Sequence, residues 1–206
     1  MRARVIVLAG PSGAGKSRLA ERLGLPVLRL DDFYRAADDP EMPRLSSGSD
    51  AGMVDWDDPA SWDQEAAVAA IARLSAEGRA EVPVYSIPDN RAIGTQLLDL
   101  HGERFFVAEG IFAAEVVAPV RGLGLLAAAY CVRQHPLVTF WRRLARDLRE
   151  HRKAPAVLVR RGFALMRAQG RVVDHAVDRG CVALTPQQGW QAVHELTGGA
   201  PGVQVG

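Results

Sequence analysis

The strongest chemical signal in the chain is a glycine-rich octapeptide near its start. Residues 10–17 read Gly-Pro-Ser-Gly-Ala-Gly-Lys-Ser, which fits the pattern G-x-x-x-x-G-K-[ST] completely. The glycines let successive backbone N–H groups turn towards one anion, and a helix that begins beside them adds the positive end of its dipole. Lys16 can reach terminal phosphates and the Ser17 hydroxyl can ligate Mg²⁺. We therefore predict that ATP and Mg²⁺ bind at Gly10, Ser12, Gly13, Ala14, Gly15, Lys16 and Ser17.

The segments on either side of the octapeptide have the patterns that a phosphate loop requires. Arg4–Ala9 is a short β-branched apolar run that predicts a buried strand. Leu19 and Leu23 lie one helical turn apart, and Gly24 ends the helix that they predict. A glycine-rich turn without a nucleotide is the alternative. Because chance matches seldom have a strand before and a helix after, the sequence favours the phosphate loop.

Acidic residues follow two other apolar runs. Asp31 and Asp32 come directly after a run at 27–30, and Glu109 follows a run at 105–108. In open parallel sheets, ligands bind beyond the carboxyl ends of the strands, where these acids are expected. A carboxylate beside the γ-phosphate can orient an alcohol and accept its proton. An aspartate that only caps a helix or turn is the alternative for Asp31.

The order of the remaining elements predicts the fold class. Strand patterns at 82–85, 125–132 and 181–184 alternate with helical patterns, one of which follows a capping-box sequence at 61–64. This alternation predicts an α/β fold of the P-loop NTPase type, a parallel sheet flanked by helices in three layers. We predict a single domain over 1–206, with an acceptor-binding insertion at about 31–60 and 82–95 and a helical lid at about 141–156.

Composition narrows the class of protein. The chain has 206 residues, 48% of them hydrophobic and 24% charged, which suits a globular fold with a substantial core. The net charge of +1 argues against a protein that coats nucleic acid or anionic membrane. There is no apolar run long enough to cross a bilayer and no room for a signal peptide before residue 4, so a cytoplasmic protein is expected. Cys131 and Cys181 are expected to be buried thiols.

Five segments, in order, resemble the uridine–cytidine kinases. Asp31–Arg35 is similar to their D-x-F-Y-R segment, and Asp55–Asp63 to their N-F-D-x-P-x-A-F-D stretch. Val82–Arg91 resembles P-x-Y-D-x-x-x-H-x-R, Glu109–Phe112 resembles E-G-I-L, and Arg143–Asp147 resembles the lid motif R-x-x-R-D. Each segment is weak alone, but with the phosphate loop they cover most of the chain.

The resemblance implies roles on the acceptor side. Asp31 would be the base that faces the sugar hydroxyl, and Asp57 would hold the ribose hydroxyls. Tyr85 would line the base pocket, and Tyr34 and Arg91 belong to the same set of acceptor-binding residues. For both tyrosines, a place in the hydrophobic core is an equal alternative.

The resemblance also implies roles on the phosphate side. Glu109 would join Ser17 around Mg²⁺, which Asp31 could also approach. Arg143 and Arg146 would close over the phosphates and offset the charge that develops during transfer. An arginine-rich helix face that is simply solvated, with local ion pairs, is the alternative for these two residues.

One segment departs from the family pattern, and it leaves the acceptor open. After Tyr85 the chain reads Ser86-Ile87-Pro88-Asp89-Asn90-Arg91, without the Asp and His of the family and one residue shorter. Those positions contact the pyrimidine in the family, so a change there changes the preferred base. The sequence thus predicts an ATP-dependent kinase for a small-molecule hydroxyl, a nucleoside first. A vitamin, sugar or antibiotic alcohol is the second reading, and an ATP-binding regulatory module without turnover is the third.

Overall fold

The molecule is built on a parallel sheet of five strands. The computed structural model describes residues 2–47, 51–134 and 170–198. The strand order is β2-β5-β1-β6-β7, and every neighbouring pair is parallel. The strands are β1 (Arg4–Ala9), β2 (Val27–Arg29), β5 (Phe105–Glu109), β6 (Leu126–Val132) and β7 (Val182–Leu184).

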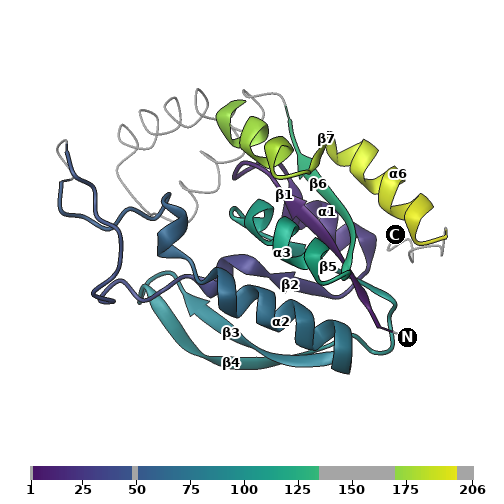
Figure 1. Ribbon diagram of the computed structural model, residues 1–206, viewed down its shortest axis with the longest axis horizontal. Helices are drawn as coiled ribbons and strands as arrows, with labels where there is room; N and C mark the ends of the chain where they lie inside the picture. The colour runs from purple at the N-terminus through teal and green to yellow at the C-terminus, as the bar shows by residue number, and fades with distance from the viewer. Residues whose placement is uncertain (1, 48–50, 135–169, 199–206) are drawn as a thin grey trace.

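Helices cover both faces of this sheet, as Figure 1 shows. Alternate residues of β1 point to opposite faces. Val5 and Val7 belong to the core beneath α2 (Gln64–Glu77) and α3 (Val117–Gly122). Ile6 and Leu8 belong to a second core beneath α1 (Lys16–Leu23) and α6 (Pro186–Leu196). The predicted fold class is therefore confirmed: an α/β sandwich of three layers.

Short 3-10 turns and one further helix connect these elements. The turn η1 (Leu30–Phe33) follows β2, η2 (Pro59–Ser61) precedes α2, and η3 (Ala113–Val116) leads into α3. Residues 170–178 are helical and lie in the sequence just before β7. The buried Ala176 attaches this helix to the core that α2 and α3 also cover.

A two-stranded hairpin stands apart from the main sheet. The strands β3 (Arg79–Ser86) and β4 (Arg91–Asp99) are antiparallel and form a sheet of their own. The sequence analysis predicted only a strand at 82–85. It missed β4 because most of this strand is exposed and Gly94 interrupts it, so no clear apolar alternation marks it.

The start of α2 differs from the predicted capping box at 61–64. The N-cap is Asp63, whose carboxylate accepts a hydrogen bond from the Ala66 N–H at 2.9 Å. Ser61 instead belongs to η2, and its hydroxyl donates to the Asp58 carbonyl at 2.7 Å. The preceding Pro59 favours this extra turn, because proline fits the first position of a helical turn. Within the described part of the chain, no helix has both the length and the apolar character needed to cross a bilayer.

Candidate active site

The loop between β1 and α1 has the backbone geometry of an anion cradle. Gly10, Gly13 and Gly15 all have positive φ angles, of 130°, 83° and 97°. A Cβ atom at Gly10 would lie 2.4 Å from the Val132 carbonyl oxygen of β6, so only glycine fits there. The loop therefore lies directly against the sheet, and its amides are at the start of α1.

Lys16 is buried at the beginning of α1. Its ammonium group donates hydrogen bonds to the carbonyl oxygens of Gly10, at 2.8 Å, and Pro11, at 3.3 Å. These hydrogen bonds hold the Lys16 ammonium group over the loop between β1 and α1. A buried lysine beside glycine amides is the arrangement that binds phosphate oxygens.

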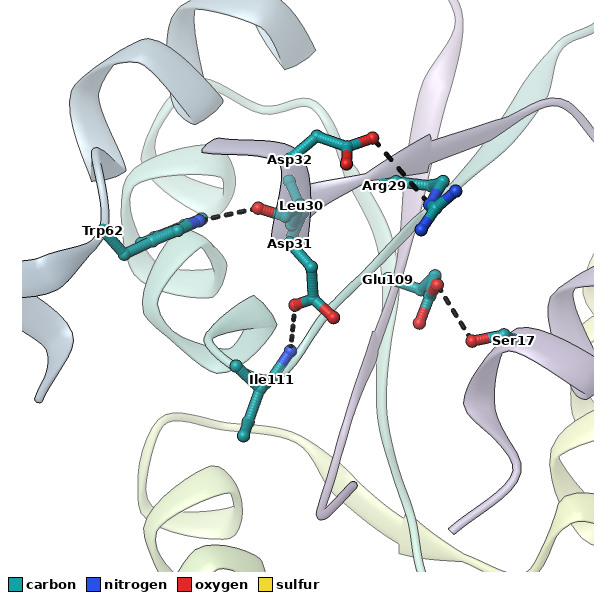
Figure 2. Close-up of polar contacts among 8 residues, drawn as sticks. All are labelled: Ser17, Arg29, Leu30, Asp31, Asp32, Trp62, Glu109 and Ile111. Carbon is teal, nitrogen blue, oxygen red and sulfur yellow. Dashed lines mark hydrogen bonds and ion pairs between the residues drawn. The ribbon is translucent and has the colours of Figure 1, made fainter. Parts of the chain in front are cut away.

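Ser17 and Glu109 come together from α1 and the end of β5. The Ser17 hydroxyl donates to Glu109 Oε1 at 3.1 Å, as Figure 2 shows. Burial raises the pKa of Glu109 above its ordinary value, and the nearby Lys16 charge partly offsets that effect. The glycine cradle, Lys16 and this hydroxyl–carboxylate pair fit a nucleotide with Mg²⁺. In the described residues, no cluster of three or more His, Cys, Asp or Glu side chains could hold a metal ion.

Asp31 lies in η1 after β2, and β5 lies between β2 and the strand β1 that leads into the phosphate loop. Its Oδ1 accepts a hydrogen bond from the Ile111 N–H at 2.8 Å, and its other carboxylate oxygen lies on the side of Glu109 and Ser17 (Figure 2). A Cβ atom at Gly110 would lie 2.8 Å from Asp31 Oδ1 and 2.9 Å from the Leu30 Cβ, so a larger residue there would displace the turn that carries Asp31. The side chain is exposed rather than directed into the core.

A buried tryptophan fixes the turn that carries Asp31. The Trp62 indole N–H donates to the Leu30 carbonyl at 2.7 Å, and Trp62 itself is 3% exposed. This contact joins the residue before Asp31 to the start of α2. Trp62 is therefore an anchor of the core.

The neighbouring Asp32 has a different environment. It is buried and lies 3.8 Å from the Arg29 guanidinium. Burial raises its pKa, and Arg29 opposes that shift. Asp31 and Asp32 therefore point to different surroundings, and only Asp31 faces Glu109.

Beside Asp31 lies a group of rings that we call the aromatic cluster: Tyr34, Trp56, Tyr85 and Phe112. The Tyr34 ring centroid is 5.6 Å from Trp56, 5.9 Å from Tyr85 and 5.8 Å from Phe112. Burial first, and then the charges of Asp31 and Asp57, raise the pKa of Tyr34. Because these charges act on the Tyr34 hydroxyl, the Asp31 and Asp57 carboxylates both lie near the aromatic cluster.

The two tyrosine hydroxyls of the aromatic cluster differ. The Tyr34 hydroxyl donates to the Trp56 carbonyl at 3.2 Å. The Tyr85 hydroxyl is buried and has no hydrogen-bond partner among the described residues. Burial also raises the pKa of Tyr85, to about 12, so this group is a neutral donor at physiological pH. A buried donor without a partner is costly, and such groups are frequent where a ligand completes the bond.

The remaining predicted residues are Asp57, Arg91 and those of the predicted lid. Asp57 is exposed near Tyr34, and its backbone N–H is held by the Asp55 carboxylate at 3.1 Å. Arg91 pairs with Asp38 at 2.9 Å, and this contact joins the hairpin tip to the 35–47 loop. Arg91 therefore lies beside that loop. Arg143, Arg146 and the predicted lid at 141–156 lie outside the described residues.

The structure also brings together polar residues that the sequence analysis did not select. Glu115 of η3 is buried, and its carboxylate lies 2.6 Å from His175 Nε2 and 3.0 Å from the Arg179 guanidinium. The Gln64 side chain donates to the Glu115 carbonyl at 2.9 Å. Sequence spacing could not reveal this cluster, because its members come from segments about sixty residues apart that meet only in the fold. The cluster of Glu115, His175 and Arg179 joins the 170–178 helix to the turn η3 that follows β5.

Comparison with solved structures defines the class of the fold. The chain superposes on a crystal structure described as a fructose transport system kinase from Silicibacter sp. TM1040, with a TM-score of 0.60 and 18% identity. The match covers 84% of this chain and 85% of that one. Together with the phosphate loop, this likeness shows the predicted P-loop NTPase fold.

Sequence comparison gives a more particular relationship. The chain is 29% identical over 117 residues to a uridine kinase from Schizosaccharomyces pombe, across 53% of this chain. It is also 26% identical over 125 residues, or 58% of this chain, to the inorganic pyrophosphatase TTM2 of Arabidopsis thaliana. The chain spans only 25% and 17% of the lengths of these two relatives, and no protein-family model matches it. The predicted resemblance to uridine kinase-like P-loop kinases is confirmed.

Proposed function

We propose that this chain is an ATP-dependent phosphotransferase whose acceptor is a hydroxyl group of a small molecule, with nucleosides as the first class to test. The observation that carries the proposal is the position of Asp31. Its exposed carboxylate is aimed by the Ile111 N–H at 2.8 Å, on the same edge of the sheet as the Ser17–Glu109 pair. A regulatory nucleotide-binding module has little use for a carboxylate held in this way.

The residues divide the work of phosphoryl transfer. ATP with Mg²⁺, when bound, supplies the γ-phosphoryl group and part of the charge that balances it. The loop amides and Lys16 would hold the phosphates, and Ser17 and Glu109 would hold the metal. Asp31 orients the acceptor hydroxyl and takes its proton as the new P–O bond forms and the bond to the β-phosphate oxygen breaks. On the family resemblance, Arg143 and Arg146 would close over the phosphates.

The aromatic cluster supports a ring-bearing acceptor. Tyr34, Tyr85 and Phe112 offer ring faces and edges beside Asp31, and Asp57 can accept hydrogen bonds from vicinal hydroxyls. The altered segment 86–91 and the fold shared with a protein described as a fructose transport system kinase favour a second candidate, a sugar or another non-nucleoside alcohol.

The test is a coupled assay of ADP release across nucleosides, sugars, vitamins and aminoglycoside-like alcohols. We expect one class of acceptor to stimulate release strongly. Asp31→Asn should lower kcat by about 10²-fold or more with ATP binding nearly unchanged. Asp32→Asn is the matched control, because this neighbouring carboxylate faces Arg29, and it should keep most of the activity. If ATP binds and no acceptor stimulates release, the regulatory reading replaces the kinase.

A further inference from the structure

The segment that follows β5 contacts both the Asp31 carboxylate and the aromatic cluster. The Ile111 N–H donates to Asp31 Oδ1 at 2.8 Å, as Figure 2 shows. The ring of the next residue, Phe112, lies 5.8 Å from the Tyr34 ring, measured between centroids. Ile111 and Phe112 are only partly buried, so packing alone does not fix them. Two groups on the acceptor side therefore depend on what holds the backbone at 111–112.

The main chain of Glu115 holds that backbone. The Glu115 N–H donates to the Phe112 carbonyl at 2.9 Å. The Glu115 carbonyl accepts a hydrogen bond from the side chain of Gln64, the first residue of α2, also at 2.9 Å. The neighbours Ala114 and Val116 are buried in the core. A displacement of Glu115 would therefore move Phe112 and the Ile111 N–H beside it.

The side chain of Glu115 fastens the same segment to the 170–178 helix and the residue that follows it. Its Oε1 lies 2.6 Å from His175 Nε2, and its Oε2 lies 3.0 Å from the Arg179 guanidinium. The Glu115 side chain is 9% exposed, and a buried carboxylate is costly unless it is paired. Each oxygen has its own partner here. Glu115 is thus held at its N–H, its carbonyl and its carboxylate.

We propose that Glu115 is a positioning residue for phosphoryl transfer: it holds the segment 111–112, which aims Asp31 and supplies a ring to the aromatic cluster. This inference rests on the proposed function, since Asp31 acts on an acceptor hydroxyl only there. Glu115 is not a catalytic residue, because its carboxylate binds His175 and Arg179. A displacement of about 1 Å at a reacting group can lower a rate by about 10²-fold, so the position of Asp31 matters for turnover.

The first experiment measures amide hydrogen exchange at Ile111 by NMR, and it needs neither acceptor nor nucleotide. A partly buried amide exchanges by local opening, so its rate reports how firmly the segment is held. In the Glu115→Ala variant, Ile111 should exchange about tenfold faster than in the wild-type chain. Glu115→Gln keeps the size of the side chain and one acceptor oxygen, so it should restore part of the protection.

His175→Ala keeps the test decisive if the loss of Glu115 prevents folding. The His175 side chain is 50% exposed, and its removal takes away one of the two partners of the carboxylate. Exchange at Ile111 should become about threefold faster. Val193→Ala is the matched control, because Val193 is buried in the other core and its truncation lowers overall stability. Unchanged exchange in the Glu115 or His175 variants, or equal acceleration in the Val193 variant, overturns the proposal.

The second experiment measures kcat with the acceptor that the ADP-release assay identifies. Glu115→Ala should lower kcat by about tenfold and leave the KM for ATP unchanged, because the phosphate loop is untouched. In the Asp31→Asn background, the same change should lower kcat by less than about twofold, since the residue that Glu115 positions no longer takes a proton. Losses that multiply in the double variant would show that Glu115 contributes only stability.

The two experiments separate the role of Glu115 from the proposed function. If no acceptor stimulates ADP release from the wild-type chain, the proposed function fails, and exchange at Ile111 still decides whether Glu115 holds the segment 111–112. If the wild-type chain turns over and the Glu115 and Asp31 substitutions act independently, the proposed function stands and the positioning role fails.

Discussion

The two halves of the candidate site consist of different kinds of chemical group. The nucleotide half consists of residues 10–17 and Glu109. It uses glycines at positive φ angles, a buried lysine bonded to its own loop and a serine bonded to Glu109. The acceptor half consists of Asp31, Asp57 and the aromatic cluster. It uses exposed carboxylates and rings from four separate segments, and it includes the Tyr85 hydroxyl, which has no partner among the described residues.

This difference indicates which half can change its ligand. The nucleotide half is fixed by contacts within one loop and against β6, so a substitution there disturbs the backbone. The acceptor half depends on side chains carried by loops, which are the usual sites of altered specificity. The departure from the family pattern at 86–91 falls in this half, while the phosphate loop keeps its complete pattern.

The largest effect is expected in the nucleotide half, from Lys16→Ala. Removing the cation that faces the phosphates should lower turnover by about 10²- to 10³-fold, measured as ADP release. Arg18→Ala, an exposed position of α1, is the control and should retain activity. Wild-type turnover in the Lys16 variant would remove the basis for calling this half a nucleotide site.

Gly10→Ala tests whether backbone geometry fixes the nucleotide half. The added methyl group would meet the Val132 carbonyl at 2.4 Å, and the φ angle of 130° is strained for alanine. We expect a loss of about 3 kcal/mol in the free energy of unfolding, measured with urea. Gly24→Ala shares the positive φ angle but meets nothing within 4 Å, so it should cost only about 1 kcal/mol. Equal losses would mean that the contact with β6 is unimportant.

Tyr85→Phe tests the acceptor half. If the Tyr85 hydroxyl bonds to the acceptor, its removal should raise the acceptor KM by about tenfold and leave the KM for ATP unchanged. The free energy of unfolding should stay the same or rise, because a buried donor without a partner is lost. Tyr34→Phe, which breaks the bond to the Trp56 carbonyl, should instead cost about 1 kcal/mol of stability. A destabilised Tyr85→Phe variant with normal KM values would make Tyr85 a structural residue.

The smallest effect concerns the carboxylate at the border of the two halves. The folded-state pKa of Glu109 lies above its ordinary value of 4.5, so the charged form lowers stability at neutral pH. Glu109→Gln should increase the free energy of unfolding at pH 7 by about 1 kcal/mol while it lowers turnover. The difference from wild type should shrink as the pH falls through the raised pKa, because Glu109 then becomes neutral.

Glu77→Gln, at an exposed pair with Arg73, is the control for that pH series. This surface pair contributes little, so the variant should follow the wild-type stability curve at every pH. A Glu109→Gln variant that is less stable than wild type at pH 7 would show that the bond to Ser17 outweighs the cost of burying the charge.

The sequence predicted those parts of the molecule that have a local pattern. The strand at 4–9 and the phosphate loop follow from apolar runs and glycine spacing, and the predicted run at 105–108 matches β5. The exposed strand β4 and the short helix α3 carry no clear period and were missed. The cluster of Glu115, His175 and Arg179 depends on distant segments meeting, which no spacing rule detects.

The contact between Gly110 and Asp31 has a consequence for protein engineering. A Cβ atom at Gly110 would meet both the Asp31 carboxylate and the Leu30 side chain, and the Trp62 indole N–H donates to the Leu30 carbonyl. The backbone at Gly110 and the Trp62 side chain thus fix the turn that carries Asp31, the proposed proton acceptor. A mutant library intended to alter acceptor choice should keep Leu30, Trp62 and Gly110 constant and randomise 85–91.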